Sequence, residues 1–88
     1  MVTSINETVR VLSVFNTKLL SATPLQMSWN DRVHRLGPVD FMHVTKKGGE
    51  RIYHFSLCTE SGGMYIKLAF FTHSLTWVLE EIEDEPAN

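Results

Sequence analysis

The stretch VTKKGGERIYHFSLCTESGGMYIKLAFF, residues 44–71, decides the fold of this chain. Near its start, Gly48-Gly49 is a preferred two-residue hairpin turn, because both glycines tolerate positive φ. Such a turn sets three pairs opposite one another: Lys47 and Glu50, Val44 and Tyr53, and Met42 and Phe55. The apolar members of these pairs share one face of the predicted hairpin.

A second turn in the same stretch is centred on Ser61-Gly62. It predicts three further pairs across the next two strands: Leu57 and Ile66, Phe55 and Leu68, and Tyr53 and Phe70. The two turns are independent, yet they place apolar side chains on the same face, and a slip of one residue in either turn would reverse a whole strand. The sequence therefore predicts a three-stranded antiparallel meander.

The segment ATPLQMSWNDRVHRLGP, residues 22–38, fits two structures. A helix over residues 24–36 would have Thr23 as its N-cap, a proline in its first turn and Gly37-Pro38 as its stop. A hairpin turning at Asn30-Asp31 would instead have one mostly apolar face. Its predicted pairs are Trp29 with Arg32, Met27 with His34, and Leu25 with Leu36. Hydrophobic periodicity alone does not decide between the helix and the hairpin.

Both ends of the chain favour strands. The run SLTWVLEEIED, residues 74–84, fits a helix or an alternating strand, but a helix would gather its acids at the negative C-terminal end, which costs roughly 0.3 to 1 kcal/mol for each. The acids are Glu80, Glu81, Glu83 and Asp84. The run ETVRVLSVF, residues 7–15, is rich in β-branched residues and predicts a first strand, although Ser4 and Glu7 could form a helix capping box.

The runs PLQMSWNDR, RIYHFSLCTESGGMYIKL and WVLEEIED resemble a group of small bacterial proteins over roughly residues 24–84. The pattern of that group is a proline, an aromatic and Trp-x-Gly-Arg, then Tyr-x-Val-x-Thr-x-x-Gly-Gly-x-Tyr-x-Leu, then Trp-x-Leu. The matching positions are Pro24, Trp29, Arg32, Tyr53, Thr59, Gly62, Gly63, Tyr65, Leu68, Trp77 and Leu79. Asp31 stands where the group usually has glycine, and His34 where it has an aromatic. The resemblance implies hairpins at both disputed segments and implies no activity, because none is established for the group.

We therefore predict a single domain, residues 1–88, that is mostly β: a curled antiparallel meander or small open barrel of five to six strands. The predicted strands span residues 8–15, 24–29, 32–44 with a bend at Gly37-Pro38, 51–58, 64–71 and 75–82. The alternative is an α+β fold that keeps the meander and has helices near residues 24–36 and 74–84. Trp29 and Trp77 are expected to anchor the core.

Length and charge limit the kinds of partner. A chain of 88 residues buries only roughly 60 to 65% of its unfolded surface, so a homodimer is a reasonable way to add buried area. Ten acids against eight bases give a net charge of -2, which does not attract phosphates, so nucleic acid is an unlikely partner. The lone Cys58 and the absence of a long apolar run predict a cytoplasmic protein without a membrane segment.

The second face of the predicted meander carries the candidate interaction residues. They are Phe41, His43, Ile52, His54, Tyr65, Lys67 and Phe71. Contiguous apolar patches usually mark interfaces, so we expect this sheet face to bind a second copy of the chain, an unidentified protein or a small ligand. Single-strand nucleic-acid binders also place aromatic side chains beside basic groups. Weak nucleic-acid or small-ligand binding by this aromatic face is therefore the alternative.

Two pairs in this region have the residue types of reactive sites. The predicted register puts His43 opposite His54, with Cβ atoms about 4.5 to 5.5 Å apart, but a zinc site needs three or four ligands. Cys58 and His54 form the nucleophile and base that the sequence shows, without a third member to orient the base. We therefore predict no metal, no cofactor and no catalytic residue, and expect a non-enzymatic binding or interaction module.

Overall fold

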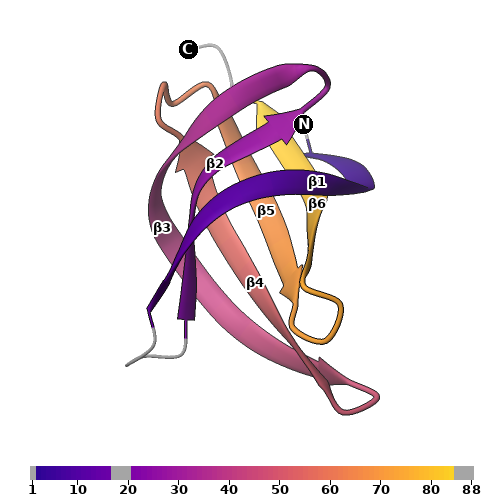
Figure 1. Cartoon of the computed structure of the whole chain (residues 1–88). Coiled ribbons are helices and arrows are strands. Elements are labelled where there is room, and N and C mark those ends of the chain that lie inside the picture. The colour runs from indigo at the N-terminus through magenta and orange to yellow at the C-terminus, as the bar shows by residue number, and fades with distance from the viewer. Residues whose placement is uncertain (1, 17–20, 85–88) are drawn as a thin grey trace.

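The computed structural model describes residues 2–16 and 21–84, which form six antiparallel strands. The strands are β1 (Val2–Asn16), β2 (Ser21–Trp29), β3 (Arg32–Lys47), β4 (Glu50–Thr59), β5 (Met64–Phe71) and β6 (Thr76–Asp84). Each strand pairs with the next, and β1 also pairs with β6, so the meander closes in a ring (Figure 1). The predicted mostly β, curled meander is confirmed. The alternative α+β fold is wrong, because residues 24–36 and 74–84 are strands and turns.

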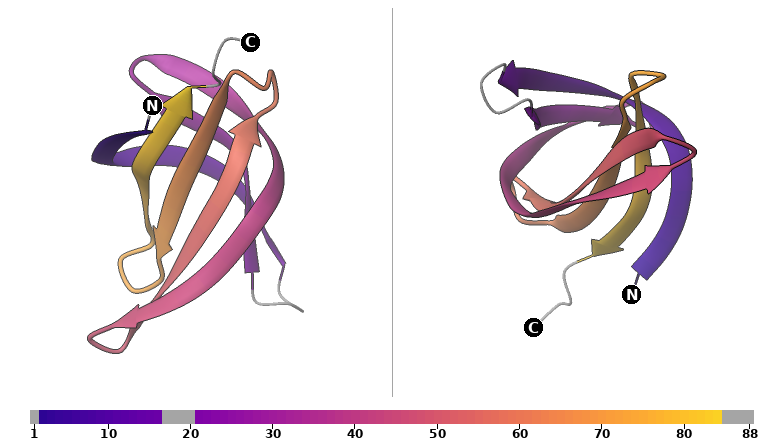
Figure 2. Two further views of the ribbon diagram at one scale, coloured as in Figure 1. Left: turned by 180° about the vertical axis from the view of Figure 1, so that it is seen from behind. Right: turned by 90° about the horizontal axis from the view of Figure 1, so that it is seen from below.

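The first strand joins the two ends of the ring. The first half of β1 pairs with β6, from Val2 opposite Glu83 to Val9 opposite Trp77. Its second half pairs with β2, starting with Arg10. Figure 2 shows the strong curvature of β1 as it passes from one partner to the other. Within the described residues, no helix has the length and hydropathy needed to cross a membrane.

The predicted turns set the register. Gly48 and Gly49 have φ angles of 57° and 84°, and Asn30 and Asp31 have φ angles of 56° and 60°. Positive φ at both central residues gives a turn whose twist matches that of the flanking strands. All six pairs predicted for the central meander are present, from Lys47 opposite Glu50 to Tyr53 opposite Phe70.

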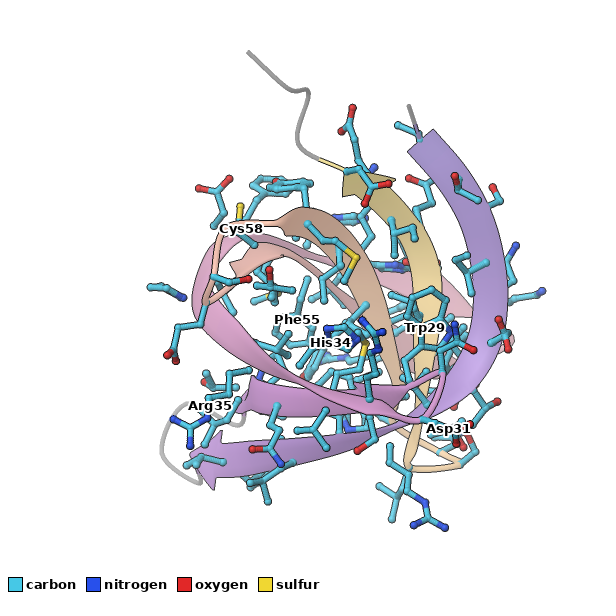
Figure 3. The ribbon with its side chains drawn as sticks, turned by 90° about the horizontal axis from the view of Figure 1, so that it is seen from above. Trp29, Asp31, His34, Arg35, Phe55 and Cys58 are labelled. Carbon is cyan, nitrogen blue, oxygen red and sulfur yellow. The ribbon has the colours of Figure 1, made fainter. Side chains whose placement is uncertain are left out.

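Inward-facing side chains from the strands form one core. Its fully buried members include Met27, Leu57, Ile66, Leu68 and Leu79. Trp77 packs against Phe55 and Phe70, with ring centroids 5.6 and 4.8 Å apart, as expected for a core anchor. Figure 3, which looks along the ring from above, shows Phe55 inside it and Arg35 pointing away from it.

Strand β2 contains a β-bulge at Leu25. Ser13 pairs with Pro24, whereas the preceding residue of β1 pairs with Gln26, so Leu25 is an extra residue. A bulge of this kind changes which positions face inward. Pro24 and Met27 are both fully buried, while Leu25 is 42% exposed. The prediction that Leu25 shares the buried face of Met27 is therefore wrong.

The far half of the β3–β4 hairpin extends beyond the ring (Figure 1). Met42 and Val44 have their predicted partners but are 44% and 45% exposed. They face inward, but they lie in a part of β3 that does not pair with β2. The last pair of those two strands is Gln26 with Arg35. The apolar face of the predicted meander is thus buried along β4 and β5 but open at this end of β3.

At the predicted bend, Gly37-Pro38, the pairing of β3 with β4 shifts by one residue. Leu36 pairs with Thr59 and Val39 with Leu57, so β3 has one residue more than β4 in this interval. A Cβ atom at Gly37 would lie 3.1 Å from the backbone oxygen of Cys58. The close approach of these two backbones explains why the smallest residue stands at the bend.

Candidate functional site

The outer face of β3, β4 and β5 carries the predicted interaction residues, and strand pairing brings most of them side by side. Phe41 pairs with Ser56, which pairs with Lys67. Phe41 is 59% exposed, and the Lys67 side chain is 51% exposed. The hydroxyl of Tyr65 donates to Oδ2 of Asp40 at 3.2 Å. These side chains form an accessible, mixed aromatic and charged surface.

Ile52 does not belong to that accessible surface. It is 5% exposed, although it lies on the outer side of the sheet beside the half-buried Phe71. The loop after β5 is held against the start of β4, because Oγ1 of Thr72 donates to the backbone oxygen of Arg51 at 2.8 Å. This loop and Phe71, the β5 partner of Ile52, therefore lie beside it. Ile52 is therefore the buried member of the predicted contact residues.

His43 and His54 lie opposite each other, as the register predicted. Their imidazole rings are stacked, with centroids 4.6 Å apart and planes inclined by 7°. The ring of Phe41 lies 5.7 Å from that of His43 and extends the row. The stack fixes the plane of the His54 ring, because a second flat ring covers one of its faces.

Both ring nitrogens of His54 are within hydrogen-bond distance of a partner. Oγ1 of Thr45 lies 2.7 Å from Nε2, and Oε1 of Glu80 lies 3.1 Å from Nδ1. An ionised carboxylate only accepts, so in the neutral imidazole Nδ1 carries the hydrogen and donates to Glu80. Nε2 then accepts from the Thr45 hydroxyl. We call Thr45, His54 and Glu80 the threonine–histidine–glutamate chain.

A bulge in β6 directs Glu80 toward His54. Lys67 pairs with Glu81 and the next residue of β5 pairs with Leu79, so Glu80 is an extra residue. The facing part of β1 is also irregular, and Asn6 there has a φ of 52°. Bulges redirect side chains and are over-represented beside active sites, and strained backbone also concentrates at functional sites. Two irregular strands therefore meet next to the hydrogen-bonded histidine.

Two hollows open on this outer face and share Lys67 and Glu81. The hollow of about 320 Å³ is lined by Ser4, Asn6, His43, His54, Lys67, Glu80 and Glu81. The hollow of about 390 Å³ is lined by Val2, Phe41, Ser56, Tyr65, Lys67, Glu81, Ile82 and Glu83. Nζ of Lys67 lies 3.4 Å from Oε2 of Glu81, so the lysine between the hollows is already paired with a carboxylate. The remaining carboxylates give both hollows an acidic lining.

Two pairs had the residue types of reactive sites: His43 with His54, and Cys58 with His54. Within residues 2–16 and 21–84, no group of three or more His, Cys, Asp or Glu side chains has the spacing of a metal site. Cys58 is a half-buried free cysteine on the outward side of β4 (Figure 3). The ring nitrogens of His54 contact Thr45 and Glu80 rather than Cys58.

A second surface lies on the outer side of β1, β2 and β3, and it is aliphatic. Its side chains are Leu12, Val14, Leu25 and Val33, which are 59%, 55%, 42% and 61% exposed. Strand pairing keeps them on one side, and the bulge adds Leu25 beside Leu12. Arg10 and Arg35 lie on the same side, two residues from Leu12 along β1 and from Val33 along β3. We call this set of four aliphatic side chains the aliphatic face.

A further hollow, of about 570 Å³, lies at the Asn30-Asp31 turn beside Trp29. Nε1 of Trp29 donates to Oε2 of Glu7 at 3.5 Å, and its ring lies 6.3 Å from that of His34. Trp29 also packs against the core (Figure 3). These contacts join Trp29 to Glu7, to His34 and to the core, which agrees with its predicted role as an anchor.

Comparison with known proteins finds no family model, curated protein or solved structure that matches the chain. Function is therefore inferred from the two surfaces themselves.

Sequence reasoning found the histidine pair but missed Thr45 and Glu80 as partners of His54. Thr45 is two residues from His43 along β3, and His43 lies opposite His54. The predicted hairpin register therefore already placed Thr45 diagonally across from His54. Glu80 reaches His54 through a bulge, and a bulge at a run of acids has no signature in residue type. Sequence reasoning also missed the aliphatic face, because Leu12 and Val14 were expected only to form part of the first strand.

Proposed function

We propose that this protein is a small non-enzymatic interaction module that self-associates, with the aliphatic face of β1, β2 and β3 as the contact surface. The observation that carries the proposal is the exposure of Leu12, Val14, Leu25 and Val33 on one side of neighbouring strands. Exposed apolar patches of this kind usually mark interfaces. The sequence predicted a homodimer that associates through the outer face of β3, β4 and β5. We propose a homodimer that associates through the aliphatic face instead.

The size of the domain supports a second copy as the partner. A chain of 88 residues has a small core, and its stability increases when apolar surface is covered by another subunit. A two-fold dimer places the same patch against itself, so the aliphatic side chains of one copy can be covered by those of the other.

Sedimentation velocity over a range of protein concentrations tests the proposal. The wild-type mass is expected to rise from the 10.1 kDa of one chain toward twice that value as concentration increases. Leu12→Glu places a charge at the centre of the aliphatic face, and we expect it to weaken association at least about tenfold. Leu75→Glu is the matched control, because Leu75 is 74% exposed in the loop between β5 and β6. A wild type that stays monomeric, or equal effects of the two changes, would contradict the proposal.

A second candidate, small-ligand binding, is favoured by the two hollows that share Lys67 and Glu81. Their carboxylates and the exposed Phe41 suit an organic cation, because aromatic faces and carboxylates both attract positive charge. The same carboxylates repel phosphates, which makes nucleic acid the weaker alternative. Titration with tetramethylammonium should shift the amide resonances of Phe41 and Lys67 and leave those of the aliphatic face unchanged. A lack of any shift on the outer face would remove this candidate.

A further inference from the structure

We propose that Thr45 is an activated hydroxyl and a covalent modification site, which accepts an acyl group from an activated ester with His54 as its base. The proposal rests on the threonine–histidine–glutamate chain and is independent of self-association. Its first support is geometry, because the 2.7 Å distance from Oγ1 of Thr45 to Nε2 of His54 is short enough for direct proton transfer.

Glu80 gives the chain its third member. Its carboxylate lies 3.1 Å from Nδ1 of His54, on the side of the ring opposite the hydroxyl. A carboxylate in this place holds the hydrogen on Nδ1, leaves Nε2 free to accept, and stabilises the imidazolium that forms when the proton arrives. The His54 and Glu80 side chains are 19% and 31% exposed, so solvent only partly screens their interaction.

The surrounding structure holds the base in place. The ring of His43 is stacked on that of His54, and the bulge in β6 supplies Glu80 from a strand that does not neighbour β4. A surface histidine without such supports rotates freely and spends little time facing any one hydroxyl. Thr45 itself is exposed, so an ester can approach its oxygen from solvent.

The reaction is a simple acyl transfer. Oγ1 of Thr45 attacks the carbonyl carbon of the ester while its proton moves to Nε2 of His54. The bond between that carbon and the leaving oxygen then breaks, and the leaving group departs with the electron pair and takes up the proton directly or through water. The product is an ester on Thr45 and a free alcohol or phenol. We expect a stable label on Thr45 rather than rapid turnover of the ester.

The test is labelling with p-nitrophenyl acetate followed by peptide mass mapping. Thr23, which is also an exposed strand threonine, is the internal control. Because Thr23 pairs with Val14 of the aliphatic face, labelling is carried out at a concentration low enough to keep the chain monomeric. We expect acetylation of Thr45 to be at least about tenfold faster than that of Thr23, since a positioned general base contributes that much or more. Alkaline hydroxylamine should remove the acetyl group from Thr45, because it cleaves alkyl esters and leaves the amides formed on lysines.

Three variants separate an activated hydroxyl from a merely exposed one. Thr45→Val should abolish the hydroxylamine-sensitive label in its peptide. His54→Ala and Glu80→Gln should each lower labelling of Thr45 to the rate of Thr23, and Glu80→Gln keeps the size of the side chain in case His54→Ala fails to fold. Labelling of Thr45 at the rate of Thr23 in the wild type, or labelling that is unchanged in Glu80→Gln, would overturn the proposal.

Discussion

At the scale of single residues, the backbone conformation of Leu75 costs stability. Its φ is 54°, a region that side chains with a Cβ seldom occupy, and the residue is 74% exposed in the loop between β5 and β6. Little packing is lost when its side chain is removed. We expect Leu75→Gly to raise the free energy of unfolding by about 0.5 to 1 kcal/mol, measured by urea denaturation. Leu75→Ala retains the strained φ and should bring no gain, so equal values for the two variants would refute the explanation.

Gly37 shows the opposite case, a residue whose missing side chain is required. A Cβ there would lie 3.1 Å from the backbone oxygen of Cys58, which is held in the ladder of β4. We expect Gly37→Ala to lower the free energy of unfolding by about 1 to 2 kcal/mol. Gly63→Ala is the comparison, because the nearest atom to a Cβ at that position is 3.6 Å away and belongs to the Ser61 side chain. Thermal melts that rank the two variants the other way would contradict this account.

At the scale of elements, the β3–β4 hairpin is divided into a buried and an open half. Val44 is 45% exposed on the inward side of the open half, whereas Val9 is 9% exposed in β1. The same change, Val to Thr, is therefore expected to cost less than about 0.5 kcal/mol at Val44 and about 1 to 2 kcal/mol at Val9, where the hydroxyl is buried. Chemical denaturation of both variants checks the difference. A large loss at Val44 would mean that a partner or another segment covers the open half.

The elements also show where sequence reasoning succeeds and where it stops. Two turns could be predicted because their residue types accept positive φ, namely Gly48-Gly49 and Asn30-Asp31. Each turn then fixes the register of the two strands that it joins. The extra residues Leu25 and Glu80 were not foreseen, because a bulge depends on how neighbouring strands coil and not on the bulged residue itself. The stacked histidines follow from the register, while the contact of His54 with Glu80 follows from a bulge. The first was therefore predicted and the second was not.

At the scale of the whole molecule, closing the ring is a long-range event. Turns join β3, β4 and β5 over short distances in the sequence, but β1 meets β6 through pairs such as Val9 with Trp77. The entropy of closing such a loop is lost before its contacts form, so we expect the local meander to form first. Val9→Ala should then speed unfolding and leave the folding rate nearly unchanged, whereas Leu68→Ala should slow folding. Stopped-flow tryptophan fluorescence measures both rates, and a slower folding rate for Val9→Ala would reverse the proposed order.

The pair of Val2 with Glu83 places the beginning of β1 beside the end of β6 (Figure 2). A short peptide can bridge such neighbours, so the six-stranded unit is suited to circular permutation, with the end of β6 joined to the start of β1 and new ends opened between Gly48 and Gly49. The same adjacency suits insertion of the domain into a surface loop of a host protein, where entry and exit points must lie close together. If the chain self-associates as proposed, the aliphatic face would then bring two host proteins together.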